Sequence, residues 1–165
     1  MEPHHDFQIP QEAFERLKDP LHIKKLVDEG KTLQEILGYS IETMDKFYEA
    51  AHSLFQKQQY EEAADAFVFL TTLNPKVHNY WLGLGMSEQL IEEYDAALMA
   101  YGMAILTNME NPLPHYHSAS CYQALHDKNS AIISLELALR QAHGREEYAL
   151  VREKSESALN QLNNK

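Results

Sequence analysis

The 165-residue chain has the length of one ordinary domain, and its 14 Lys and Arg against 25 Asp and Glu give a formal net charge of −11 that disfavours nucleic-acid and anionic-lipid partners. Its single cysteine, Cys121, allows no intrachain disulfide and favours a reducing compartment. The start, MEPHHDFQIPQEAF, lacks a basic segment followed by an apolar run, and no stretch of about 18 apolar residues occurs, so we expect a cytosolic protein without stable membrane association.

Residues 1–43 predict an N-terminal arm with short helices. Their apolar residues include Phe14, Leu17, Leu21 and Leu26. Pro20 should interrupt this first helical stretch, because proline inside a helix removes a backbone donor. The segment TLQEILG predicts one short helix that begins at Thr32 and stops at Gly38. Since the apolar residues ahead of the repeats need a partner surface, we expect a weak homodimer through residues 1–43.

A 34-residue period follows the arm. Its clearest unit matches the W-x2-L-G … A-x3-F … A signature of the tetratricopeptide repeat through Trp81, Leu84, Gly85, Ala97, Tyr101 and Ala104. Adding 34 gives His115, Ser118, Ala119, Ala131, Leu135 and Ala138, and subtracting 34 gives Phe47, Ala50, Ala51, Ala63, Phe67 and Leu70. We predict an all-α fold, a right-handed superhelix of three repeats (44–77, 78–111 and 112–145) with N-terminal helices and a C-terminal capping helix.

Residues typical of helix ends and turns predict where the turns of this superhelix lie. Ser40 is predicted to cap the first helix of the first repeat. The inner turns are expected at KQQ (57–59), IEE (91–93) and HDK (126–128), and the linker between units two and three at TNMENP (107–112). Gly144 is typical of a helix end, and the polar segment 146–165 after it predicts the capping helix.

Two glycines interrupt the helical segment YWLGLG, and each costs about 1 kcal/mol relative to alanine in a helix interior. Gly85 shares its place in the repeat with Ala51 and Ala119, so it is predicted to be a packing residue where two helices cross near Tyr101. Gly83 lies on a neighbouring face. It could let a partner approach the backbone or could be a tolerated weak position, and we favour the second interpretation.

No motif in the sequence predicts catalysis. The chain has no Walker-type phosphate loop, G-x-S-x-G elbow, C-x-x-C or H-E-x-x-H motif, so we expect no enzyme activity, cofactor or metal site. His115 and His117 are the best candidate metal ligands, but residues two apart do not share a helix face, and a metal hydrolase would need a third ligand. Cys121, beside Ala119, is expected to be a buried core thiol.

A second apolar row in the first repeat indicates a binding surface. Tyr48, His52 and Phe55 follow one another at i, i+4 and i+7, on a different side from the packing face. Because first helices line the concave side of such superhelices, the row predicts a groove formed by Tyr48, His52, Phe55, Leu82, Met86, Gln89 and Tyr116. The alternative is that Tyr48 and Phe55 pack under the N-terminal arm.

Three segments together resemble a narrower family. TLQEILGYSIETMDKFYEAAHSLFQKQQYEEAADAF, YWLGLGMSEQLIEEYDAALMAYGMAIL and NPLPHYHSASCYQAL are similar to the class II chaperones of bacterial type III secretion, which serve translocator proteins. The resemblance spans residues 32–143, and its most specific parts are LGLG, TLQEILG and the three-repeat layout. It implies a small acidic protein of the bacterial cytoplasm that binds hydrophobic translocators and keeps them soluble before secretion.

The resemblance also implies how the client is held, as an extended segment with spaced proline and leucine anchors in the concave groove. It assigns groove roles to Tyr48, His52, Phe55, Leu82 and Met86, and self-association to the N-terminal helices. The third unit departs from the pattern: His115 stands where a larger apolar residue is usual, and Met109 and His143 replace terminal prolines.

A general repeat adaptor that joins soluble proteins is the alternative function. One class of such adaptors clamps the acidic C-termini of heat-shock proteins with concave Lys, Arg and Asn residues. The corresponding places here hold Tyr48, His52, Gly83, Leu113 and His117, so this version is excluded by the sequence.

Overall fold

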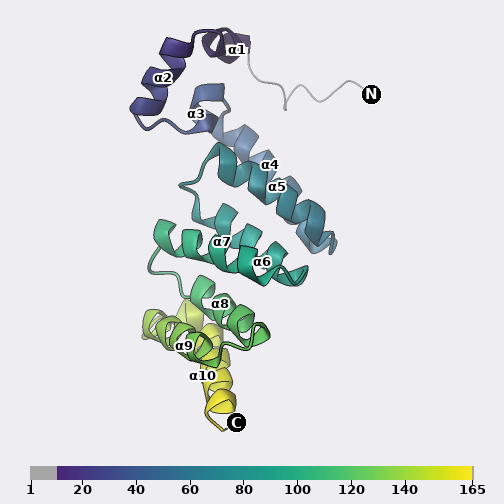
Figure 1. Ribbon diagram of the computed structural model, residues 1–165, viewed down its shortest axis with the longest axis vertical. Helices are drawn as coiled ribbons and strands as arrows, with labels where there is room; N and C mark the ends of the chain where they lie inside the picture. The colour runs from purple at the N-terminus through teal and green to yellow at the C-terminus, as the bar shows by residue number, and fades with distance from the viewer. Residues whose placement is uncertain (1–10, 165) are drawn as a thin grey trace.

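The computed structural model describes residues 11–164, and it confirms the all-α superhelix expected from the 34-residue period. The helices stack along one long axis, with α1 and α10 at opposite ends (Figure 1). Their bounds are α1 (Gln11–Leu17), α2 (Pro20–Asp28), α3 (Leu33–Leu37), α4 (Ile41–Gln56), α5 (Tyr60–Leu73), α6 (His78–Leu90), α7 (Tyr94–Thr107), α8 (Leu113–Ala124), α9 (Lys128–Ala142), the 3-10 turn η2 (Glu146–Tyr148) and α10 (Ala149–Asn163). Residues 1–10 of the expected arm and residue 165 of the expected capping helix lie outside the described residues.

The N-terminal arm is broken where the sequence indicates. Pro20 is the first residue of α2, and the Asp19 carboxylate caps this helix by accepting hydrogen bonds from the backbone N–H groups of Leu21 and His22. Helix α3 begins at a capping box and ends at Gly38, whose φ of 73° is left-handed and favours glycine. The expected break at Pro20 and the short helix that stops at Gly38 are both confirmed.

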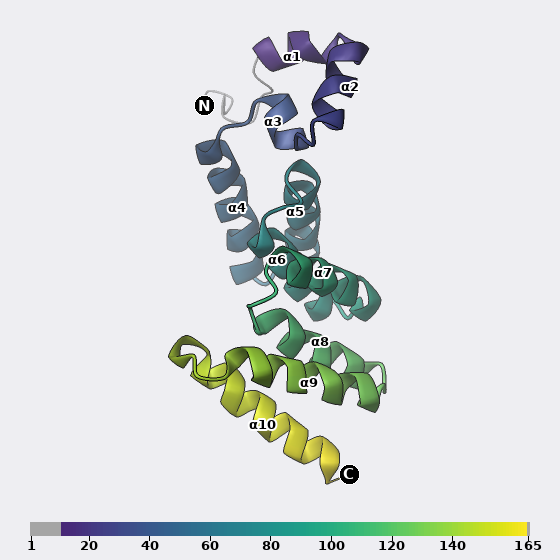
Figure 2. The ribbon, with the colours of Figure 1, turned by 90° about the vertical axis from the view of Figure 1, so that its left-hand side faces the viewer.

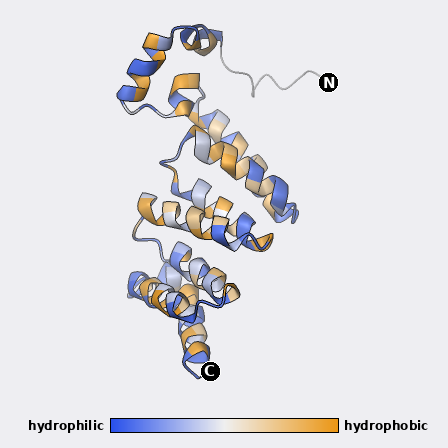
Figure 3. Cartoon of the chain, viewed as in Figure 1, coloured by the Kyte–Doolittle hydropathy of each residue, from blue (hydrophilic) through white to orange (hydrophobic). Residues whose placement is uncertain are grey.

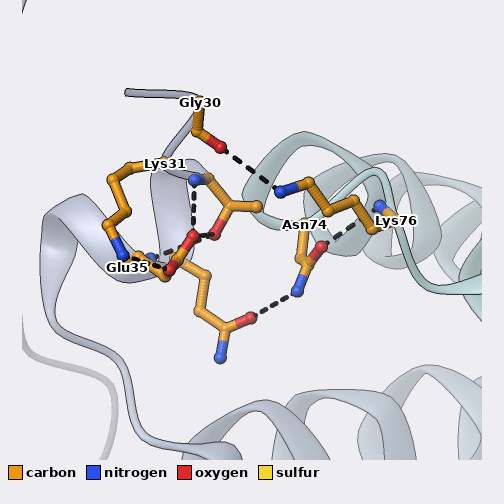
Figure 4. Close-up of polar contacts among 7 residues, drawn as sticks. Gly30, Lys31, Glu35, Asn74 and Lys76 are labelled. Atoms are coloured by element: carbon orange, nitrogen blue, oxygen red, sulfur yellow. Dashed lines mark hydrogen bonds and ion pairs between the residues drawn. The ribbon is translucent and has the colours of Figure 1, made fainter. Parts of the chain in front are cut away.

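Polar contacts fasten α3 to the first repeat (Figure 4). The Asn74 side chain donates a 2.8 Å hydrogen bond to Gln34, and Lys76 donates to the Gly30 carbonyl at 3.3 Å. The Glu35 carboxylate accepts from the Thr32 backbone N–H at 2.8 Å, which is the main reason why its pKa is lowered to about 2. The arm is therefore held against the end of α5 by side chains from both segments.

The helix pairs α4–α5, α6–α7 and α8–α9 are joined by the three expected inner turns. Each turn contains one residue with left-handed backbone geometry: Gln58, Glu92 and His126, with φ of 61°, 65° and 60°. Ser40 caps α4 by accepting a hydrogen bond from the Thr43 backbone N–H at 3.2 Å, as predicted. The linker between the second and third pairs also lies where expected, between Thr107 and Leu113.

The prediction that Gly85 is a packing residue is confirmed, and the favoured interpretation of Gly83 is wrong. A Cβ atom on Gly85 would lie 2.5 Å from the Tyr101 ring, so Gly85 is a packing residue where α6 and α7 cross. A Cβ atom on Gly83 would overlap the Phe67 ring. The favoured interpretation of Gly83 as a tolerated weak position was therefore wrong, because α6 approaches α5 too closely there for any side chain.

The C-terminal end of the stack is covered by α10, which packs mainly against α9 (Figure 2). Gly144, with a φ of 70°, lies in the connection after α9. Apolar residues concentrate in the helices of the repeats, and hydrophilic residues in the turns and linkers (Figure 3). None of the helices between residues 11 and 164 has both the length and the apolar character needed to cross a membrane.

Candidate functional site

One face of the superhelix is formed by the first helices of the three pairs. Helix α4 contacts α6, and α6 contacts α8, whereas the second helices of successive pairs lie further apart, so the first helices form the concave face. A cavity of about 140 Å³ opens between α4, α5 and α6, and we call it the α4–α6 cavity. It is lined by Tyr48, His52, Phe55, Phe67, Asn79, Leu82, Gly83 and Met86.

The cavity brings together most of the groove residues proposed from the sequence: Tyr48, His52, Phe55, Leu82 and Met86. The two others lie elsewhere. Gln89 accepts a 2.7 Å hydrogen bond from the Tyr101 hydroxyl, and the Tyr116 ring lies 5.2 Å from the ring of His117. These two side chains are placed near the junction between the second and third repeats.

Phe67, Asn79 and Gly83 line the cavity but were not among the predicted site residues. Phe67 is a buried residue of α5 and is 2% exposed, so its ring closes the inner end of the cavity. A Cβ atom on Gly83 would overlap this ring, so the glycine lets the backbone of α6 lie directly against Phe67. The signal that could have found the pair was the unexplained glycine itself, read together with the large residue of the preceding unit that it must face.

Aromatic contacts hold the cavity walls in place. The Tyr48 ring lies 5.7 Å from Tyr80 and 6.1 Å from Phe67, while the Phe55 ring meets Tyr60 edge-on at 5.4 Å. These partners belong to the repeats. The N-terminal arm instead reaches the first repeat through Tyr39, whose ring lies 5.6 Å from Phe47, a residue of the packing face.

The lining of the cavity is mainly apolar and carries no formally charged side chain among the described residues. No Asp, Glu, Lys or Arg belongs to the set of described residues that line it. Burial raises the pKa of the Tyr80 hydroxyl behind the Tyr48 wall, and the nearby negative charge of Asp45 adds to the effect. A ligand in this cavity would therefore be recognised chiefly through buried apolar surface.

Two side chains of α8, His117 and Cys121, pack near the buried Tyr101 of α7, whereas His115 lines a different surface of α8. The His117 ring stacks on Tyr101 at 5.6 Å, and burial lowers its pKa to about 4, with Lys154 acting in the same direction. Burial raises the pKa of the Cys121 thiol to about 11, so it is protonated at neutral pH. Within residues 11–164, no three His, Cys, Asp or Glu side chains converge as a metal site would require.

Comparisons with known proteins show which proteins are similar to this chain. No protein-family model matches the sequence. The Low calcium response locus protein H of Yersinia pestis is 26% identical over 113 residues, which cover 68% of this chain and 67% of that protein. The Yersinia enterocolitica translocator chaperone SycD, solved with a peptide of the translocator YopD, is 25% identical with a TM-score of 0.73, covering 75% of this chain and 95% of that one.

The chain has the fold of the type III secretion translocator chaperones. A third comparison agrees: the Pseudomonas aeruginosa protein PcrH, solved with the chaperone-binding region of PopD, is 24% identical with a TM-score of 0.76, covering 77% of this chain and 96% of that one. The resemblance expected from LGLG, TLQEILG and the three-repeat layout is confirmed. In this translocator-chaperone fold, the α4–α6 cavity lies on the concave face, between the first and second repeats.

Proposed function

We propose that the protein is a chaperone that holds an extended segment of a hydrophobic translocator along its concave face. The observation that carries this proposal is the α4–α6 cavity, an apolar pocket on that face within a translocator-chaperone fold. SycD and PcrH, which share the fold, were solved with translocator segments. The client segment is proposed to carry spaced proline and leucine anchors.

The size of the cavity supports an apolar anchor. A space of about 140 Å³ suits one leucine or proline side chain of the client. Burying a leucine contributes about 1.5 to 3 kcal/mol, which corresponds to roughly tenfold or more in affinity. His52 and Asn79 add polar groups at the cavity wall that can bind the client backbone. Further anchors would lie along the same face.

Binding to the folded chaperone lowers the concentration of free client by mass action. The apolar surface of the bound client is masked and unavailable to other chains, so aggregation is reduced. This mechanism needs no nucleotide, metal or cofactor, and we propose that the protein is not an enzyme. The net charge of −11 opposes aggregation of the chaperone and disfavours binding to anionic lipid. The bacterial cytoplasm, where translocators await secretion, is the proposed compartment.

The N-terminal arm is proposed to form a weak homodimer. Three apolar side chains of α1 and α2 are largely exposed: Phe14 at 54%, Leu21 at 79% and Val27 at 57%. Isolated helices this short need a packing surface to be stable, and a second copy of the arm would provide one. One solved structure of SycD, which shares the fold, is an alternative dimer of that chaperone, and this supports self-association here.

The decisive experiment identifies and then measures the client. Proteins that co-purify with the chaperone from its native host are identified by mass spectrometry, and overlapping synthetic peptides covering them are titrated by calorimetry. We expect binding to a segment of a secreted protein with apolar membrane-spanning regions, and little weakening by added salt because the cavity is apolar. A soluble signalling protein as the bound partner would instead support the adaptor function and refute the proposal.

A further inference from the structure

The junction between the second and third repeats has residues at the positions equivalent to Phe67 and Gly83 of the α4–α6 cavity, and one of them differs in kind. In the first junction, Phe67 of α5 faces Gly83 of α6. Moving 34 residues along the sequence, the same two places are taken by Tyr101 of α7 and His117 of α8. The second junction therefore has an aromatic floor like the first, but a histidine where the first has no side chain.

The histidine covers that floor. The His117 ring lies nearly parallel to the Tyr101 ring, at 15° between planes and 5.6 Å between centroids, and Tyr101 is 0% exposed. Leu82 and Met86, the counterparts of the cavity residues Tyr48 and His52, pack against the same buried cluster. The second junction thus has apolar walls and a floor, with an imidazole ring in the place that an anchor would take.

We propose that His117 is a built-in plug that closes a second anchor pocket, so that the α4–α6 cavity alone takes a deep anchor and sets the register of the client. The statement about the client rests on the function proposed above. The proposal that the His117 ring fills a pocket does not rest on that function, because it concerns a pocket that exists once the imidazole is removed. His117 is on this view a specificity-determining residue of the groove.

The first test needs no client and uses toluene as the probe. Tyr101 ring signals are followed by NMR while toluene is added to wild type, to His117→Ala and to His115→Ala. Alanine favours helix, so the substitution removes the ring without weakening α8. His115→Ala is the matched control, because it removes a half-buried histidine of the same helix that lines a different surface, toward α7 and α9.

We expect toluene to shift the Tyr101 signals in His117→Ala and to leave them unchanged in wild type and in His115→Ala. Equal responses in all three proteins would overturn the proposal, because the pocket would then be either open already or never formed. Loss of the helical fold in His117→Ala, seen by circular dichroism, would also overturn it by showing that the ring belongs to the core.

The second test measures register with a peptide that binds wild type, in which leucine replaces each residue in turn. We expect one position at which leucine tightens binding to His117→Ala by about tenfold, with no gain at that position in wild type. If no position distinguishes the two proteins, the plug does not control register. If no translocator peptide binds wild type at all, the proposed function fails while the toluene result still decides the plug.

Discussion

Phe55→Ala should separate client binding from folding. The phenyl ring of Phe55 lines the α4–α6 cavity, is half-buried and meets the ring of Tyr60 at 5.4 Å. A fully buried Phe→Ala change costs about 3 to 5 kcal/mol, so this half-buried ring should cost about 1 to 2 kcal/mol. For a chain of this size we expect Tm to fall by roughly 2 to 8 °C. Tyr48 is a poorer probe, because it also packs against Phe67 and Tyr80.

Binding should suffer more than stability in this variant. Truncating an aromatic wall at a binding hot spot costs about 2 kcal/mol, or roughly 30-fold in Kd. The assay is a calorimetric titration with the client peptide beside a thermal melt. Phe69→Ala is the matched control, because Phe69 also has an edge-on ring contact, with Phe47 at 5.3 Å, is 46% exposed and lies outside the cavity lining. Equal affinity for Phe55→Ala and wild type, or equal losses in both variants, would refute the assignment of the groove.

Three further predictions, two of them with a matched control variant, test other parts of the structure. Gly83→Ala should lower Tm, because its Cβ would overlap the Phe67 ring, whereas Gly102→Ala, with nothing within 4 Å, should raise it by removing a helix penalty of about 1 kcal/mol. In wild type, the His117 imidazole takes up a proton near pH 6.5 in the unfolded chain but only near pH 4 in the folded chain. Wild type therefore loses stability as the pH falls through this window. His117→Gln should flatten the dependence of Tm on pH between about 6.5 and 4, because this imidazole is gone. Leu21→Glu should reduce the mass measured by light scattering at high concentration, while Met99→Glu, similarly exposed at 76% but outside the arm, should not.

The sequence predicts the helix pairs well because their signals are local or strictly periodic. The 34-residue spacing places small residues where helices cross, and Gly85 against Tyr101 shows that this spacing reports packing. Caps are equally local: the side chain of Ser40 needs only the Thr43 backbone N–H three residues later. Within the candidate site, the apolar row on α4 could be found because a helix with two apolar faces needs two partners.

Contacts between residues far apart in the sequence could not be read in the same way. His78 links the start of α6 to the end of its repeat: its Nδ1 donates to the Ala104 carbonyl at 2.8 Å, and its Nε2 accepts from the Asn111 side chain at 2.8 Å. Nothing near His78 in the sequence indicates these partners, which lie 26 and 33 residues away. The floor of the cavity is a similar case, because Phe67 and Gly83 meet only when one repeat is docked on the next.

Two glycines of the second repeat, Gly83 and Gly102, differ in whether the structure requires them. Both carry the same helix penalty of about 1 kcal/mol, but a side chain fits at Gly102 and does not fit at Gly83. The structure gives no reason for glycine at Gly102. At Gly83 the backbone of α6 packs directly against the Phe67 ring, which lines the α4–α6 cavity, and in the next repeat His117 covers the equivalent Tyr101. A regular repeat would offer equivalent pockets at both junctions, so a client with several apolar anchors could slide between them. Under the proposal made above, a glycine at one of these equivalent positions and a histidine at the other remove that ambiguity.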